Sequence, residues 1–178
     1  RVGFLAKITG QHMGLPARQL QELEWAGLLH DVGKIGIPEH VLNKPGRLTD
    51  EEFALIKEHP ARSFEVLRPV ASLEPVLDAV LYHHENPDGT GYPCGLAVEE
   101  IPLLARIIHV VDVFDALTST RSYRQAYRVE RAIDILRKDA GTKLDRHIVD
   151  QFLRAWAQFP QSHPEQLQRW FGSKEQPA

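Results

Sequence analysis

The stretch Ala26-Gly-Leu-Leu-His30-Asp31-Val-Gly-Lys34 places an imidazole and a carboxylate side by side at the end of an apolar helical segment. A buried His and Asp without partners would cost several kcal/mol, on the order of the loss for any desolvated polar pair. A metal ion would replace the water that both groups lose. Neighbouring helical residues point about 100° apart, but a carboxylate has two oxygens and can bridge two ions. The stretch therefore predicts a metal site that other parts of the chain complete.

The composition is typical of one globular domain. With 178 residues, 43% of them hydrophobic, the chain can bury one substantial core. The formal net charge of -3 argues against a surface for polymeric nucleic acid, although a local basic patch could bind a small phosphate-bearing ligand. The single cysteine, Cys94, excludes an internal disulfide, and no apolar run is long enough to span a bilayer. We therefore expect a cytoplasmic domain and, because the chain opens at Arg1 in a helical pattern, a piece of a longer protein.

Apolar residues recur at helical spacing along most of the chain, and no strand alternation or internal repeat stands out. The run Thr49-Asp-Glu-Glu52 has the pattern of a capping box, and Pro60 is placed for the first turn of the next helix. The sequence therefore predicts an all-α fold in a single domain, with a loosely packed tail over residues 160–178. The predicted helices cover about 2–13, 20–33, 49–59, 60–67, 76–84, 103–117, 132–136 and 148–156.

The candidate metal ligands come from separate predicted helices: His30, Asp31, His59, His83, His84 and Asp112. A tetrahedral zinc site is closed by four ligands, usually with cysteines when it is structural, whereas a His and carboxylate set with water suits iron, manganese or hydrolytic zinc. This number of ligands predicts two ions. Two ions about 4 Å apart can share a hydroxide nucleophile and stabilise both oxygens of a phosphate ester displacement. The predicted reaction is phosphoester hydrolysis.

The segment His30-Asp-Val-Gly-Lys34, followed by His83-His-Glu-Asn-Pro-Asp-Gly-Thr-Gly-Tyr-Pro93, resembles the HD-GYP family of metal-dependent phosphodiesterases. The resemblance covers almost the entire chain, including Lys44-Pro-Gly46 and residues 112–119. An HD pair alone would imply only the broader HD hydrolases. The longer pattern implies an N-terminally truncated HD-type helical bundle over residues 1–159. It also implies hydrolysis of the bacterial messenger cyclic di-GMP to pGpG, in some members on to GMP.

By this resemblance, two divalent ions share Asp31 as a bridge, and iron or manganese would fit best, with zinc and nickel also accepted. One ion would also take His30 and Asp112, and the other His59, His83 and His84. The family has a further His, and in some members a Glu, just before the position of Arg1. Neither is in this sequence, so we expect truncation and an incomplete first metal site.

The resemblance also assigns the substrate contacts. Asp31 and Lys34 would be catalytic, with Lys34 stabilising charge or donating a proton at the scissile phosphate. Arg121 and Arg124 would bind the phosphate and the guanine edges. The loop of Gly91, Tyr92 and Pro93 would shape the substrate mouth and form a surface for GGDEF diguanylate cyclase domains.

Simpler structural roles remain open for these residues. His30 and Asp31 could form a buried capping pair, His59 a helix-end cation, and Asp112 an acceptor for Arg106 or Arg121. Lys34 and the two arginines could be solvated surface cations. We exclude the remaining histidines because they lack partners at ligand spacing: His12, His40, His109, His147 and His163.

The expected function is that of the C-terminal output domain of a bacterial signalling protein, preceded by a sensory or receiver domain as in two-component systems. Self-association as a homodimer is left open. One alternative is a catalytically weak domain that binds cyclic di-GMP or a protein partner and relays a signal. The other is a phosphodiesterase for a different cyclic dinucleotide, such as cyclic GMP-AMP.

Overall fold

The computed structural model describes residues 1–120 and 124–172, which are helical apart from loops and isolated β-bridges. The predicted all-α class is confirmed. No helix in this described part is long and apolar enough to cross a membrane. In chain order the elements are α1 (Val2–His12), α2 (Ala17–Leu29), the 3-10 helix η1 (Val32–Gly36), α3 (Glu39–Leu42), α4 (Asp50–Lys57), α5 (His59–Leu67), η2 (Ala71–Val76), α6 (Leu77–Leu81), α7 (Leu103–Thr118), α8 (Val129–Asp139), α9 (Arg146–Ser162) and α10 (Pro164–Phe171).

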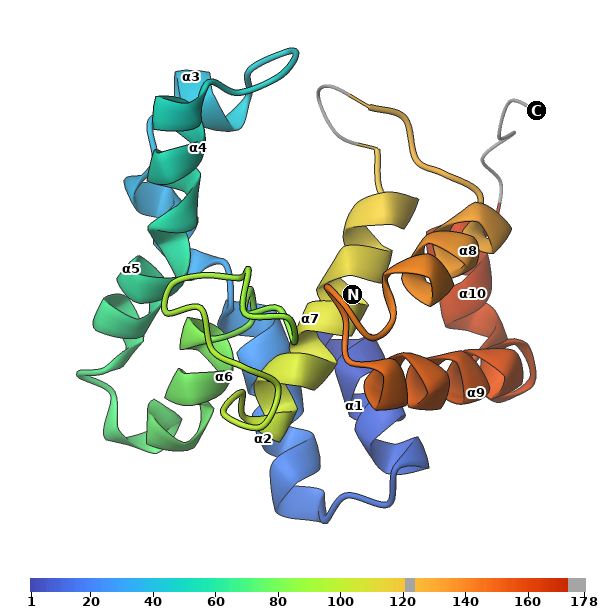
Figure 1. Ribbon diagram of the computed structural model, residues 1–178. Helices are drawn as coiled ribbons and strands as arrows, with labels where there is room; N and C mark the ends of the chain where they lie inside the picture. Colours follow the sequence, from blue (N-terminus) through green and yellow to red (C-terminus); the bar gives the residue numbers. More distant parts are fainter. Residues whose placement is uncertain (121–123, 173–178) are drawn as a thin grey trace.

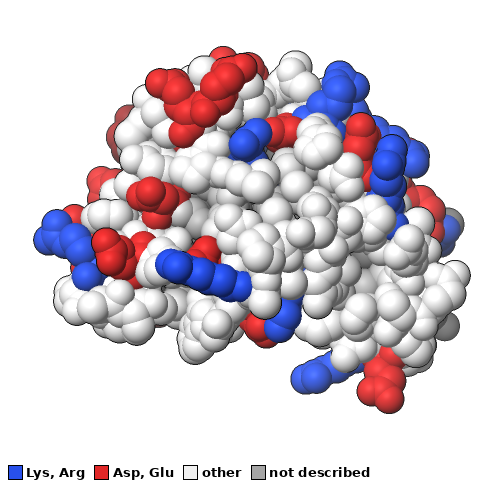
Figure 2. Space-filling model, turned by 90° about the horizontal axis from the view of Figure 1, so that it is seen from below, with Lys and Arg blue, Asp and Glu red and all other residues white. Residues whose placement is uncertain are grey.

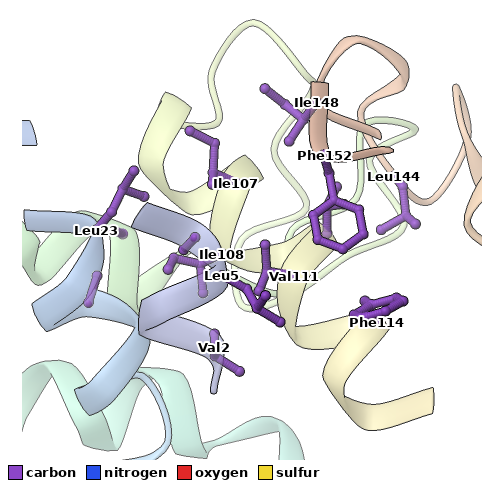
Figure 3. Packing of buried hydrophobic residues seen from close by; sticks show 14 of the residues in the cluster. Val2, Leu5, Leu23, Ile107, Ile108, Val111, Phe114, Leu144, Ile148 and Phe152 are labelled. Atoms are coloured by element: carbon purple, nitrogen blue, oxygen red, sulfur yellow. The ribbon is translucent and has the colours of Figure 1, made fainter. Parts of the chain in front are cut away.

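Helix α7 is the axis of the bundle, and α1, α2, α6, α8 and α9 all contact it (Figure 1). Most of its apolar side chains are completely buried: Ala105, Ile107, Ile108, Val110, Val111 and Phe114. Figure 3 shows side chains of α1, α2 and α9 converging on this helix. Full burial of one such side chain stabilises the fold by about 1.5–3 kcal/mol. The labelled residues of this core are Val2, Leu5, Leu23, Ile107, Ile108, Val111, Phe114, Leu144, Ile148 and Phe152.

The predicted capping box opens α4, because the Thr49 side chain accepts from the Glu52 backbone N–H while the Glu52 carboxylate accepts from that of Thr49. Helix α4 ends at Lys57, and α5 begins at once with Pro60 in its first turn. Residues 39–57, which we call the α3–α4 arm, rise from one side of the bundle in Figure 1.

The structure corrects two predicted segments. The helix expected over 76–84 stops at Leu81, so His83 and His84 lie in the turn that follows α6. The tail expected to be loose from residue 160 instead continues α9 to Ser162 and then forms α10, whose Trp170 ring lies 5.2 Å from that of Phe4. Pro164 does not end a helix because it occupies the first turn of α10, where proline is tolerated.

Charged side chains are of mixed sign on the face drawn in Figure 2. Lysines, arginines and acidic residues lie mainly toward its edges, with a broad uncharged area between them. No continuous basic band crosses the described residues of this face. This face therefore lacks the electrostatic pattern of a surface for polymeric nucleic acid.

Candidate metal centre

The ends of three helices and the middle of a fourth bring all the predicted ligands together. His30 ends α2 and Asp31 precedes η1, while His59 is the first residue of α5. The His83-His84 turn follows α6. Asp112 comes from the middle of α7. Residues separated by 82 positions therefore share one cluster, which we call the histidine cluster: His30, Asp31, His59, His83, His84 and Asp112.

Backbone carbonyls fix the orientation of three imidazoles in this cluster. The Nδ1 of His30 donates to the carbonyl of Gly27 at 2.9 Å. In the same way His59 donates to Ile56 at 2.7 Å, and His83 to Val80 at 2.6 Å. A carbonyl can only accept, so each Nδ1 carries a proton, and in the neutral imidazole the Nε2 then presents a lone pair. Three helix ends thus use the same contact, to the carbonyl three residues back, to aim an imidazole inward.

The inward-facing nitrogens meet each other and two carboxylates. The Nε2 of His59 lies 3.3 Å from that of His83 and 3.2 Å from Oδ1 of Asp31. The Nε2 of His30 lies 3.4 Å from Oδ2 of Asp31 and 3.5 Å from Oδ1 of Asp112. The two oxygens of Asp31 therefore face different imidazoles, an arrangement that suits a bridging carboxylate.

Several of these atoms have no partner that satisfies them. His30 Nε2 and Asp31 Oδ1 are buried without a hydrogen bond among the described residues. Lone pairs that face each other and two carboxylates repel unless a cation lies between them. Two triads have ligand atoms within 4.8 Å of one another, namely His59, His83 and His84, and His30, Asp31 and His83. The residues present therefore fit a bound metal, with His83 near both groups.

The electrostatics keep the carboxylates charged and most imidazoles neutral. Burial alone would raise the pKa of Asp31 and Asp112, but His59 and His30 outweigh it and hold both pKa values below their usual range. Burial lowers the pKa of His84 to about 3 and that of His83 well below its usual value. For His30, burial lowers the pKa, but Asp112 and Asp31 more than compensate and raise it. Anionic carboxylates and neutral imidazoles are the forms that bind metals.

Lys34 extends this centre toward solvent. It lies on η1, and its Nζ is 2.7 Å from Oδ2 of Asp31, the carboxylate shared by the cluster. Its side chain is 29% exposed, so the ammonium group stands at the rim of the cluster. The catalytic role expected of Lys34 from the sequence stays a prediction.

The Gly91-Tyr92-Pro93 loop closes over the cluster. The Tyr92 ring stacks on His84 with centroids 4.8 Å apart, and the Tyr92 N–H donates to the His84 carbonyl at 3.1 Å. Gly91 packs so closely on the backbone of Glu85 and Asn86 that a Cβ would overlap it. The loop therefore contacts a candidate ligand directly.

Sequence reasoning missed the residue that holds this loop, Glu85. Its side chain is buried and accepts three backbone N–H groups, from Cys94 at 2.6 Å, Gly95 at 3.2 Å and Leu96 at 2.9 Å. The sequence does contain a signal for this role. Glu85 is a carboxylate that directly follows two candidate ligands and precedes a turn-rich loop. Its neighbour in the fold, His109, is also buried and bonds to the backbone of Glu85, and burial lowers its pKa to about 4.

Ser63 is a second missed residue, because it joins two ligand-bearing segments. Its hydroxyl accepts from the Gly33 N–H at 2.8 Å and donates to the His30 carbonyl at 2.8 Å. A Cβ on Gly33 would overlap Ser63 and the carbonyl of His59. The close approach of η1 and α5 therefore requires a glycine at position 33.

The substrate role predicted for Arg124 stays a prediction, and in the structure its guanidinium has other partners. Its guanidinium donates to the carbonyls of Ala116 at 2.7 Å and Leu117 at 3.2 Å, at the end of α7, and lies over the Tyr127 ring. These bonds satisfy helix-end carbonyls, so Arg124 is a capping residue in this structure. Arg121, its predicted partner, lies outside the described residues. Arg106 bonds to Asp145 at 2.8 Å, which removes it as the alternative partner of Asp112.

Comparison with known proteins places this site in context. A family model described as HD domain matches residues 1–148. The chain is 42% identical over 163 residues to "Cyclic di-GMP phosphodiesterase response regulator RpfG" of Xanthomonas campestris, a match that covers 90% of this chain and 43% of that protein. It is 35% identical over 162 residues to "3'3'-cGAMP-specific phosphodiesterase 1" of Vibrio cholerae, covering 90% of this chain and 38% of that protein. The chain thus spans less than half of either relative.

A solved structure has the same fold. It is described as Bd1817, an HDG"Y"P protein from Bdellovibrio bacteriovorus, and it superimposes with a TM-score of 0.70 at 22% identity. The match covers 88% of this chain and 50% of that one. At this identity the likeness concerns the fold, which agrees with the HD-type bundle expected from the sequence.

Proposed function

Because the chain belongs to the HD domain family, in its HD-GYP branch, we propose that it is a metal-dependent cyclic di-GMP phosphodiesterase that opens the messenger to pGpG. The observation that carries the proposal is the set of imidazole lone pairs, fixed by backbone carbonyls, that converge on the carboxylates of Asp31 and Asp112. Such a set is suited to divalent cations and to phosphate ester chemistry.

We further propose two divalent ions, iron or manganese, because Asp31 presents its oxygens to two different imidazoles. His30 and Asp112 would complete one site, and His59, His83 and His84 the other. When bound, such ions polarise phosphoryl oxygens and lower the pKa of water toward neutrality.

The side chains of the protein would prepare this chemistry. Asp31 and Asp112 stay anionic because neighbouring imidazoles lower their pKa values, so they need not lose a proton before binding a cation. Lys34 carries a positive charge at the rim of the cluster, where it would bind a phosphodiester oxygen and neutralise developing charge. The stacked Tyr92 covers His84 and would limit the access of water from that side.

A second candidate is hydrolysis of 3'3'-cGAMP, favoured by the relative with that specificity. The two relatives each cover 90% of this chain, and identity is 42% to the cyclic di-GMP enzyme against 35% to the cGAMP enzyme. This difference makes cyclic di-GMP the first choice.

The Gly91-Tyr92-Pro93 loop would also serve a protein partner, for which we propose a GGDEF diguanylate cyclase domain. Tyr92 and Pro93 line a pocket of about 690 Å³ together with Ile35, a residue that is 89% exposed. Binding assays with a wild-type partner and a Pro93→Glu variant would test this part of the proposal.

The central experiment combines elemental analysis of the purified protein with hydrolysis assays on cyclic di-GMP and 3'3'-cGAMP, before and after chelation. We expect divalent metal at up to two ions per chain, turnover of cyclic di-GMP, and loss of turnover on chelation. His147→Ala is a matched control, because His147 is an exposed histidine of α9. Full metal loading without hydrolysis of either messenger would instead favour a relay domain that binds nucleotide or protein.

A further inference from the structure

A cavity of about 700 Å³ opens between α3, the following loop and α4, beside the histidine cluster. Such a volume lies in the usual range for small-molecule sites. Its apolar walls come from Val41, Leu42, Leu48, Phe53 and Ile56. Its polar lining consists of Lys34, Lys44, Arg47 and Asp50.

Lys34 joins this cavity to the metal centre. It lines the cavity, and its Nζ lies 2.7 Å from the Asp31 carboxylate. A phosphodiester held at the histidine cluster would therefore have one of its nucleoside arms next to the entrance of the cavity. The geometry links the reacting phosphate to a specific place for a base.

The charged groups of the lining differ in their availability. Lys44 already has an ionic partner, because its Nζ lies 2.6 Å from the Glu52 carboxylate. Arg47 is exposed and makes no ion pair or hydrogen bond within the described residues. Asp50, in the first turn of α4, likewise has no cationic partner there. Among the residues that the structure describes, the Arg47 guanidinium and the Asp50 carboxylate thus have no charged partner.

These two groups match the edges of guanine. A guanidinium can donate two parallel hydrogen bonds to O6 and N7. A carboxylate can accept from N1–H and the exocyclic N2 amine of the same base. Adenine has an amine in place of O6 and no N1–H, so it would leave both side chains poorly matched. The apolar walls and the Phe53 ring suit the faces of a purine.

We propose that this cavity binds one guanine of the substrate and that Arg47 and Asp50 determine its specificity for guanine over adenine. This inference deepens the proposed function and rests on it for the identity of the dinucleotide. It assigns the choice of base to the α3–α4 arm, outside the histidine cluster.

The first test measures kcat/KM for cyclic di-GMP, 3'3'-cGAMP and cyclic di-AMP with the wild type, Arg47→Ala and Asp50→Asn. One bidentate contact discriminates between bases by about 10-fold or more. We expect each substitution to reduce the preference for cyclic di-GMP over cyclic di-AMP by at least that factor. Metal content should stay unchanged. Arg154→Ala and Asp150→Asn, exposed positions of α9, are the matched controls.

The second test measures equilibrium binding of 5'-GMP and 5'-AMP to the same proteins, so it needs no turnover. The wild type should prefer GMP, and both variants should lose that preference. Unchanged base preference in an active wild type and its variants would overturn the inference and leave the proposed function intact. The proposed function would be rejected, and the base site supported, by a different result. In that case the wild type hydrolyses no cyclic dinucleotide but prefers GMP to AMP, and both variants lose this preference. Absence of both effects would reject both.

Discussion

The histidine cluster and the α3–α4 arm meet at Lys34, but they hold their polar groups in opposite ways. In the cluster, backbone carbonyls of Gly27, Ile56 and Val80 fix the imidazoles, and neighbouring helices bury them. In the arm, Arg47 is exposed and free of ion pairs within the described residues. From this difference we infer separate roles for the two regions. The backbone contacts of the cluster would position the ions, and the exposed side chains of the arm would select the base.

The strongest way to break the cluster is Asp31→Asn. The substitution keeps the shape of the side chain but removes the charge that faces His30, His59 and Lys34. We expect loss of at least one metal ion per chain and a fall in kcat/KM of about 10³-fold or more, equivalent to several kcal/mol of transition-state stabilisation. Elemental analysis and the hydrolysis assay check both effects. Activity within tenfold of the wild type would show that Asp31 is not a shared ligand.

Glu85→Gln tests whether the contacts of Glu85 with the backbone of residues 94–96, outside the histidine cluster, also help to position that cluster. Glutamine keeps one acceptor oxygen but turns an NH₂ group toward N–H groups of residues 94–96. The loop that stacks Tyr92 on His84 should loosen, and metal affinity should fall about 10- to 100-fold, as for other groups that orient ligands. Competition with a chelator measures the affinity. Glu99→Gln is a suitable control, because Glu99 is an exposed glutamate near this loop.

The comparison of cluster and arm also separates what the sequence could predict from what it could not. Helical spacing found the central helix α7, and the capping box at Thr49 located the start of α4, because both are local patterns. The candidate ligands were found because their residue types and order follow a family pattern. Their convergence in space agrees with that pattern, although their roles as ligands remain predictions.

Features that depend on tertiary contacts could not be predicted in this way. The position of Glu85 before a turn-rich loop marks it as a candidate, but the local sequence does not indicate that its carboxylate binds the backbone of residues 94–96. It also does not indicate that Ser63 bridges His30 and Gly33. The aromatic residues of α10 pack on the core although Pro160 and Pro164 precede them. Proline marks a constraint on the local backbone, whereas the packing that follows it is decided elsewhere in the chain.

Acid should destabilise the metal-free protein through its buried imidazoles. Burial lowers the pKa of His84 to about 3 and that of His109 to about 4, whereas an unfolded histidine titrates near 6.5. Between these values the unfolded chain binds more protons, so the free energy of unfolding falls as pH drops from about 6.5 toward 4. The raised pKa of His30 opposes this trend in part.

Thermal unfolding of the metal-free protein between pH 7.5 and 4.5 measures the effect. Each pKa unit corresponds to about 1.4 kcal/mol, so we expect a loss on the order of a few kcal/mol across this range. His109→Leu should flatten the pH dependence because it removes one of the buried groups. His147→Leu, at an exposed position, should leave the slope unchanged. A profile that is flat in the wild type would contradict the assignment of neutral buried imidazoles.

The smallest expected effect distinguishes Arg124 from Arg47, which the sequence analysis did not single out. The Arg124 guanidinium is engaged by carbonyls of Ala116 and Leu117, so Arg124→Ala should cost about 1 kcal/mol of stability, or roughly 2–4 °C in Tm. It should leave KM for cyclic di-GMP within about twofold. Arg47→Ala should do the reverse, with Tm unchanged and a higher KM, because Arg47 supports no other part of the described structure. A large rise in KM for Arg124→Ala at constant Tm would restore its predicted role at the substrate. Such a result would also mean that its bonds to α7 break when the dinucleotide binds, so this cation would resemble the adaptable groups of the arm more than the fixed groups of the cluster.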